Sequence, residues 1–209
     1  MYKRQTFLGS ALLNIAGGIP FLPGQILWIN FLVDAPPGAA LGMDKASPGL
    51  MERKPRPLSQ PVLSRSQWVR VIIIGLLMTV GTLILEAVAE QTGASVAATM
   101  GFVVFSLFNV VIALSCRSET NSAFNRDILS DRHQLMLYGL ALLFVFVPVE
   151  LGLPRFLGLT SLTGDQWLIC IAFAFALLLA TEVVKVFLRR SRSRQKDATV
   201  PAAPAPAQA

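Results

Sequence analysis

The stretch of sequence that decides the fold is Leu27-Trp28-Ile29-Asn30-Phe31-Leu32-Val33-Asp34-Ala35-Pro36-Pro37-Gly38. It is an apolar run that carries one carboxamide, Asn30, and one carboxylate, Asp34, ahead of two prolines. If the run is helical, Asn30 and Asp34 share one face, because residues four apart are neighbours on a helix surface. Pro36 and Pro37 cannot donate backbone hydrogen bonds, so we expect a helix break that leaves carbonyl groups of the preceding turn without helical partners.

These groups together predict half of an ion site. Carboxylate, amide and free backbone carbonyl oxygens are the ligands that hard cations such as Ca²⁺ and Mg²⁺ prefer. A carboxylate at the centre of a membrane segment costs about 3 kcal/mol, so its presence there indicates a function by default. Only Asp34 combines depth in an apolar segment with a same-face amide and a helix break.

The composition predicts a polytopic membrane protein. Of the 209 residues 54% are hydrophobic and only 14% are charged, and the mean hydropathy is +0.60, which is too apolar for an ordinary soluble domain. The net charge of +6 comes from basic residues at the ends of apolar segments, so we expect no nucleic-acid partner. Cys116, Cys170 and His133 show no spacing typical of a zinc site or redox pair.

Hydropathy predicts an all-α membrane protein built as a helical bundle, with membrane lipid as its surroundings. Segments of about 20 apolar residues are long enough to span a bilayer. Five such segments are expected as complete transmembrane helices, at residues 24–43, 68–89, 96–116, 134–153 and 166–188. Residues 7–19 would form a partial sixth helix, bent away at Gly17-Gly18-Ile19-Pro20.

The basic residues predict the orientation of the chain. They gather in the connections 44–70 and 117–132 and in the tail after Lys185, whereas the two other connections hold only Arg155. By the positive-inside rule, both basic connections and the C-terminus should be cytoplasmic in a multi-pass protein of the cell membrane.

Composition also suggests how the chain divides. Residues 6–190 would form one transmembrane domain, followed by a tail, 191–209, that is basic, then rich in Ala and Pro, and expected to be disordered. Residues 1–5 match a translated transposon end used in sequencing libraries, and we hypothesise that they are an adaptor artefact.

Three further polar groups lie within the apolar segments. Asn109 is in the middle of its span, where an amide either bonds a neighbouring helix or faces an ion path. Glu86 and Glu150 are near the outer ends of their spans, so we expect both carboxylates to reach water or lipid headgroups. Small residues such as Gly81 and Gly101 should let the helices pack closely.

Several of these stretches resemble the calcium-pump-like branch of the P-type cation-transporting ATPases. Residues 22–30, followed by Asp34, Pro37 and Ala40-Leu41-Gly42, resemble the sixth membrane helix of that family. Residues 51–56 are similar to its Arg/Pro-rich loop between helices six and seven, and residues 108–119 to the end of its eighth helix. The resemblance covers about residues 6–190 and implies that the chain is the C-terminal transmembrane part of a longer protein.

The resemblance implies metal-binding roles for Asn30, Asp34 and Asn109. Asn30 and Asp34 match cation ligands on the family's sixth helix. Val33 falls where pumps with two ion sites have a threonine ligand, and Asn109 falls where they have a glutamate. These two differences favour a single transported ion in each cycle.

The family's reaction forms and hydrolyses an aspartyl-phosphate, and the parts that carry it out are not in this sequence. No Asp-Lys-Thr-Gly-Thr motif and no phosphate-binding loop is found, and no soluble stretch is longer than the connection 44–70. We therefore expect no catalytic residue and no ATP site in this chain. ATP and Mg²⁺ would be bound only in the intact parent, by upstream actuator, phosphorylation and nucleotide domains.

The expected function is the ion-translocating part of an ATP-driven pump, with Ca²⁺ as the expected cargo. A Mg²⁺ pump is the alternative, since ion selectivity depends on cavity size and ligand number rather than on oxygen ligands alone. A stand-alone secondary transporter would be expected to repeat the broken helix in a second half, and no second copy is found. A structural membrane scaffold leaves the cost of burying Asp34 unexplained.

Overall fold

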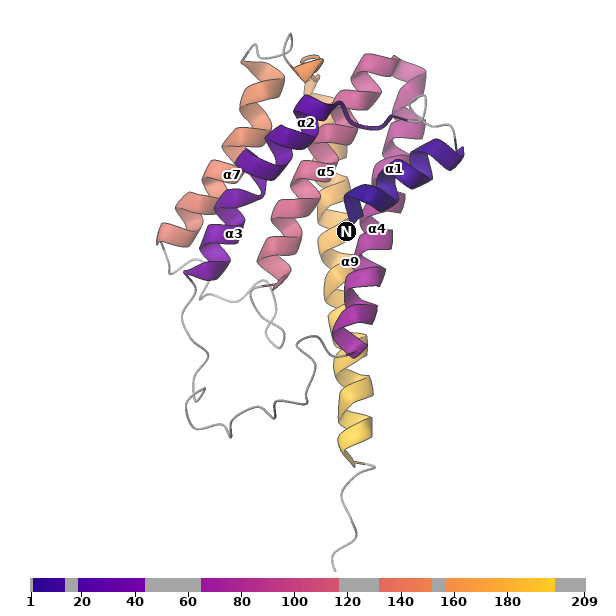
Figure 1. Ribbon diagram of the computed structural model, residues 1–209, viewed down its shortest axis with the longest axis vertical. Coiled ribbons are helices and arrows are strands. Elements are labelled where there is room, and N and C mark those ends of the chain that lie inside the picture. Colours follow the sequence, from indigo (N-terminus) through magenta and orange to yellow (C-terminus); the bar gives the residue numbers. More distant parts are fainter. Residues whose placement is uncertain (1, 14–18, 44–64, 117–131, 152–156, 198–209) are drawn as a thin grey trace, which may run out of the picture.

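The computed structural model describes residues 2–13, 19–43, 65–116, 132–151 and 157–197. These residues are helical almost throughout and include no strand, which confirms the all-α class (Figure 1). The elements, in chain order, are α1 (Tyr2–Leu13), α2 (Pro23–Trp28), the π-helix η2 (Ile29–Val33), α3 (Ala35–Gly42), α4 (Arg65–Ala89), the 3₁₀ turn η3 (Glu90–Thr92), α5 (Ala94–Cys116), α7 (Arg132–Glu150) and α9 (Gly164–Asp197).

Four predicted membrane spans are confirmed as continuous helices. Within the described ranges, the helices long and apolar enough to cross a membrane are Gln67–Thr92, Ala94–Cys116, Arg132–Glu150 and Gly164–Val184. The predicted span 24–43 is different, because it is divided among α2, η2 and α3. None of its three pieces alone has the length of a membrane span. Of the partial helix expected over 7–19, residues 7–13 are helical as part of α1. Residues 14–18, which include Gly17 and Gly18 of the predicted bend, lie outside the described residues.

The last helix is longer than the hydropathy pattern predicts. α9 continues to Asp197, so residues 191–197, which we assigned to a disordered tail, are helical. Arg, Gln and Lys have high helix propensity and can continue a helix beyond its apolar part, which explains the difference. The remainder of the tail, 198–209, and the greater part of the two basic connections, 44–64 and 117–131, lie outside the described residues.

The helices run alternately between two ends of one bundle. α3 and α5 finish at the end where α4 and α7 begin, and α9 also finishes toward that end (Figure 1). The opposite end holds the start of α2, the turn η3 and the start of α9. This alternation agrees with the predicted topology, in which successive spans cross in opposite directions.

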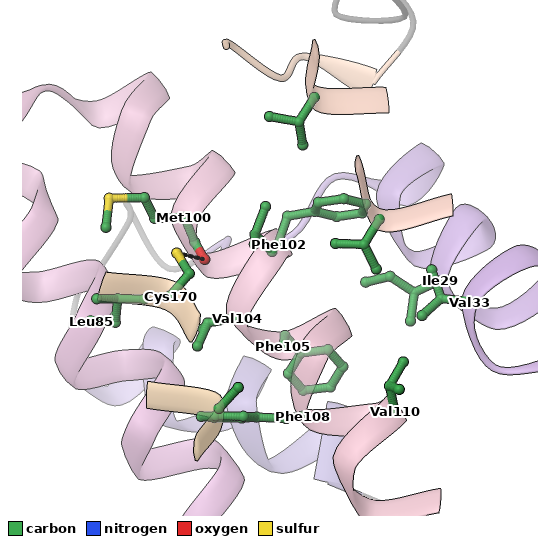
Figure 2. Packing of buried hydrophobic residues seen from close by; sticks show 14 of the residues in the cluster. Ile29, Val33, Leu85, Met100, Phe102, Val104, Phe105, Phe108, Val110 and Cys170 are labelled. Atoms are coloured by element: carbon green, nitrogen blue, oxygen red, sulfur yellow. Dashed lines mark hydrogen bonds between the residues drawn. The ribbon is translucent and has the colours of Figure 1, made fainter. Parts of the chain in front are cut away.

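The central helix of the bundle is α5. In its most apolar stretch 67% of residues are buried, against 22% in that of α9. Its aromatic residues Phe102, Phe105 and Phe108 are among the largest buried side chains, and they pack with Ile29 and Val33 of η2 in one core cluster (Figure 2). α5 therefore positions the predicted ion segment relative to the remainder of the bundle.

Two glycines allow α4 and α5 to approach closely, as predicted. A Cβ atom on Gly81 of α4 would lie 3.1 Å from the Phe108 ring of α5. A Cβ atom on Gly101 of α5 would lie 2.8 Å from Cγ and Cδ of Glu86 on α4 and would collide with its Oε1. Close helix contacts of this kind need residues without side chains.

Candidate cation site

A π-helix replaces the break that we predicted before the two prolines. Residues Ile29–Val33 form the π turn, and the Asp34 N–H donates to the Ile29 carbonyl oxygen at 2.9 Å, five residues back. The helix thus continues through the segment, and its hydrogen-bond pattern changes instead of ending. Single π turns inside α-helices occur frequently at functional sites.

The prolines lie at the first positions of the next helix, where a missing N–H does no harm. Pro36 and Pro37 occupy the N-terminal turn of α3, and the Gly38 N–H donates to the Asp34 carbonyl at 3.1 Å. This is the position that proline favours in helices, since the first N–H groups have no intrahelical acceptor. Because these residues have no N–H, the carbonyls of Leu32 and Val33 receive no α-type bond from them.

The π turn has one side buried in the core and one exposed side, which carries Phe31 as well as Asn30. Ile29 and Val33 are buried in the core cluster against α5, whereas Asn30 is exposed and Asp34 is half-buried, with its Oδ1 atom buried. Asn30 lies within the π turn, and Asp34 is the residue that ends it. Val33, which falls where two-site pumps of the resembled family have a threonine ligand, is buried in the core.

Asn109 lies on the central helix, which contacts both η2 and α3. Its side chain is 8% exposed, and its amide Nδ2 donates to the Phe105 carbonyl at 3.0 Å in the preceding turn. The Asn109 Oδ1 atom is buried and has no hydrogen-bond partner among the described residues. An acceptor oxygen held in this way is suited to a cation, because the amide hydrogen bond already fixes its orientation.

Two hydrogen bonds fasten α2 to other parts of the bundle. The Gln25 side chain is 1% exposed, donates from Nε2 to the Leu157 carbonyl at 2.9 Å and accepts from the Leu22 N–H at 3.1 Å. The Trp28 Nε1 donates to the Phe144 carbonyl of α7 at 2.8 Å, and its ring meets the Phe144 ring edge-on. The helix before the π turn is therefore held on two sides.

Sequence reasoning missed the role of Gln25 and was wrong about Glu86. Gln25 is the one amide inside the apolar stretch before Trp28, and that placement could have indicated a buried contact. Glu86, expected to reach water, has an exposed fraction of 0%. Glu150 is half-buried and accepts from the Trp167 Nε1 at 2.8 Å.

The donor set indicates which ions the segment can bind. No group of three or more His, Cys, Asp and Glu side chains that could hold a metal ion occurs in the part of the chain that the structure describes. The predicted ligands are instead one carboxylate and two amides beside backbone carbonyls, an oxygen-only set that suits Ca²⁺ or Mg²⁺ rather than zinc. Ca²⁺ takes six to eight oxygens, so these residues would supply part of a coordination shell.

Comparisons with known proteins find several calcium-transporting ATPases to which this chain is similar. A calcium-transporting ATPase of Schizosaccharomyces pombe is 38% identical over 110 residues, which cover 52% of this chain and 12% of that protein. One from Yarrowia lipolytica is 29% identical over 164 residues, covering 72% and 18%. The mouse calcium-transporting ATPase type 2C member 2 is 29% identical over 183 residues, covering 82% and 19%.

The chain spans less than one fifth of the length of these relatives. A family model described as "Cation transporting ATPase, C-terminus" matches residues 18–187, which include the π turn, the whole of α5 and most of α9. The chain belongs to this family, the C-terminal membrane part of the cation-transporting ATPases.

Proposed function

We propose that this chain forms part of the ion path of an ATP-driven pump that moves Ca²⁺, one ion in each cycle. The observation that carries the proposal is the π turn at Asp34, an acidic residue in a membrane segment of a chain in the cation-transporting ATPase family. Calcium is favoured as cargo because the relatives described above are named calcium-transporting ATPases.

In this proposal Asp34 supplies negative charge and Asn30 supplies a neutral oxygen from the π segment. Asn109 supplies its Oδ1 from α5, where the atom has no other partner among the described groups. The carbonyls of Leu32 and Val33, which receive no bond from Pro36 and Pro37, add neutral oxygens. A single site follows from the residues at 33 and 109, because Val33 has no oxygen on its side chain and Asn109 has no charge.

The bundle also offers a way to couple the site to motion. α2 is fixed to α7 and to Leu157 through Trp28 and Gln25, so movement of the membrane domain would be absorbed at the π turn. The parent protein would supply ATP hydrolysis through an aspartyl-phosphate, with its own Mg²⁺. We place the protein in the cell membrane with its C-terminus in the cytoplasm, since the basic connections favour that orientation.

The test is ion-dependent ATP hydrolysis by the full-length pump that contains this chain. Asp34→Asn should abolish Ca²⁺-stimulated hydrolysis, because it removes the charge while keeping the shape of the side chain. Asp165→Asn, at an exposed position at the start of α9, is the matched control and should leave hydrolysis unchanged. Unchanged Ca²⁺ affinity in Asp34→Asn would overturn the proposal. If Mg²⁺ transport, and not Ca²⁺, stimulated ATP hydrolysis by the wild-type pump, the cargo would be Mg²⁺.

A further inference from the structure

One buried acidic side chain, Glu86, has no part in the proposed cation site. It lies on α4 with an exposed fraction of 0%, and neither carboxyl oxygen has a hydrogen-bond partner among the described residues. Its carboxyl group occupies the space that a side chain on Gly101 of α5 would fill. The absence of a Cβ atom at position 101 therefore makes room for this carboxyl group.

The surroundings of Glu86 contain other polar groups, and the next acid along the chain, Glu90, is exposed. Thr82, one turn earlier on α4, is also fully buried, and its Oγ1 has no partner in the described part of the chain. Thr79 continues the row and meets Thr6 of α1, with 3.4 Å between their hydroxyl oxygens. The face of α4 that bears Glu86 thus also carries a row of threonine hydroxyl groups.

Among the described side chains of the elements packed against α4, few are titratable. η3 carries Glu90, which is exposed and lies one turn beyond Glu86, while α5 has none before Cys116 at its far end. The described side chains of α9, which end at Val184, include exposed Asp165, buried Cys170 and Glu182. The described side chains of α1, from Gln5 to Leu13, include no titratable group. Arg70 lies at the other end of α4, so no described cation faces the carboxyl.

We propose that Glu86, in the space left by Gly101, is a proton-binding site separate from the Asp34 cation site. An ionised carboxylate that is buried without partners is strongly disfavoured, whereas a proton neutralises it and needs only one oxygen. A Ca²⁺ or Mg²⁺ ion would need about six or more oxygens, and the groups described around Glu86 do not provide them. Binding transfers a proton from hydronium to one Oε atom, leaving water and a neutral carboxylic acid.

The site is near one end of the bundle and distant from the cation segment. The exposed Glu90 is four residues away, so one helical turn separates the buried carboxyl from a surface position. Asn109 lies eight residues beyond Gly101 on α5, which corresponds to about 12 Å along the helix axis. The proton site can therefore exchange with water at the η3 end without passing the predicted cation ligands.

Infrared spectroscopy of the chain in lipid vesicles tests the proposal. The wild-type spectrum minus that of Glu86→Gln should show a carboxylic acid C=O band at neutral pH. This band should give way reversibly to carboxylate bands as the pH is raised. Carboxylate bands at every pH, or an acid band that never responds to pH, would overturn the proposal. A change of the band on adding Ca²⁺ at constant pH would indicate a metal site and would also overturn it.

A second measurement needs no variant and decides the matter if Glu86→Gln fails to fold. Dicyclohexylcarbodiimide is a lipid-soluble reagent to which a protonated carboxyl adds across a C=N bond, with its proton passing to nitrogen and its oxygen to carbon. Mass spectrometry should find the label on Glu86, with loss of labelling at high pH. Exposed Glu90 is the internal control and should stay unlabelled. Labelling of Glu90 but not Glu86 would contradict the inference.

Discussion

Asn30 and Val33 are three positions apart in the sequence and lie in opposite environments. Asn30 is exposed at the surface of this chain, whereas Val33 has an exposed fraction of 0% and packs in the core beside α5. At the scale of single residues, the π turn therefore decides which side chains are available to an ion and which hold the segment in place.

Restoring a hydroxyl at position 33 should weaken the fold without adding a cation site. Val33→Thr places a hydroxyl group in an apolar cluster, which we expect to cost about 1–3 kcal/mol. Denaturant titration of the chain in detergent micelles, followed by circular dichroism, measures the change. Leu32→Thr, at a half-buried position beside it, is the control and should cost less. A Val33→Thr chain as stable as the wild type would show that the core accommodates the hydroxyl.

Gln25 joins α2 to a segment 132 residues away in the chain. Gln25→Leu keeps a similar volume but leaves the buried Leu157 carbonyl without its donor, so we expect a loss of about 1–3 kcal/mol. The same titration measures it, and Gln91→Leu, at an exposed position, should have little effect. Equal stability of the two variants would mean that the carbonyl finds another donor.

At the scale of elements, the segment 23–42 is a helix that changes its hydrogen-bond pattern once. α2 is held by Gln25 and Trp28, and α3 packs against α7 and buries Pro36, Pro37 and Ala40. The π turn between them therefore lies between two fixed pieces.

Replacing one proline should make the π turn more rigid. In Pro37→Ala the new N–H can donate to the Val33 carbonyl, which has no α-type donor in the wild type. We expect slower hydrogen exchange of the amides of residues 29–34, measured by mass spectrometry on the chain in lipid nanodiscs. Gly139→Ala, on α7 at a position where an added Cβ atom would meet nothing within 4 Å, is the control and should leave exchange in this segment unchanged. Unaltered exchange in Pro37→Ala would mean that the new donor stays unused.

The elements differ in how well the sequence predicts them. Hydropathy alone located α4, α5, α7 and α9, because long apolar stretches have few alternative structures in a membrane. The two prolines indicated an irregularity near Asp34, and the structure has one there, in the turn before Asp34. It is a π turn and not the predicted helix break, and the two place the same residues differently. Whether the segment forms a break or a π turn depends on how α3 packs on α7, and a local sequence pattern carries no information about that packing.

Some features of the candidate site could also be predicted from the sequence, and others could not. Asn30 and Asp34 could be selected from residue type and spacing, and Asn109 from its place in the middle of a span. The burial of Glu86 could not, because a position near the end of a span does not say whether the side chain points to water or to a neighbouring helix. The small residue that decides it, Gly101, is on a different helix.

At the scale of the whole molecule, the bundle is organised around α5. This helix contacts α4, α7, α9, η2 and α3, so most of the described elements meet on it. It bears Asn109 on its path through the core and Gly101 against Glu86. Changes in α5 should therefore affect the entire fold, and changes on the outer faces of other helices should not.

A pair of phenylalanine substitutions tests this organisation. Phe105 on α5 has an exposed fraction of 0% and contacts the Phe21 ring at 5.0 Å between centroids, whereas Phe175 on α9 is 53% exposed. Phe105→Ala should cost about 3–5 kcal/mol, and Phe175→Ala no more than about 1 kcal/mol. Denaturant titration in micelles measures both. Similar costs for the two would contradict a central role for α5.

The π turn also sets the rotation of α3 relative to α2 about the helix axis. It holds one more residue than an α-helical turn of the same length, and removing that residue would rotate everything after it by about 100°. Such a rotation would carry the buried faces of Pro36, Pro37 and Ala40 away from α7. The packing of α3 thus keeps the extra residue in place, and a shift of α3 along α7 would be enough to reset the angle between Asn30 and the core without unwinding either helix.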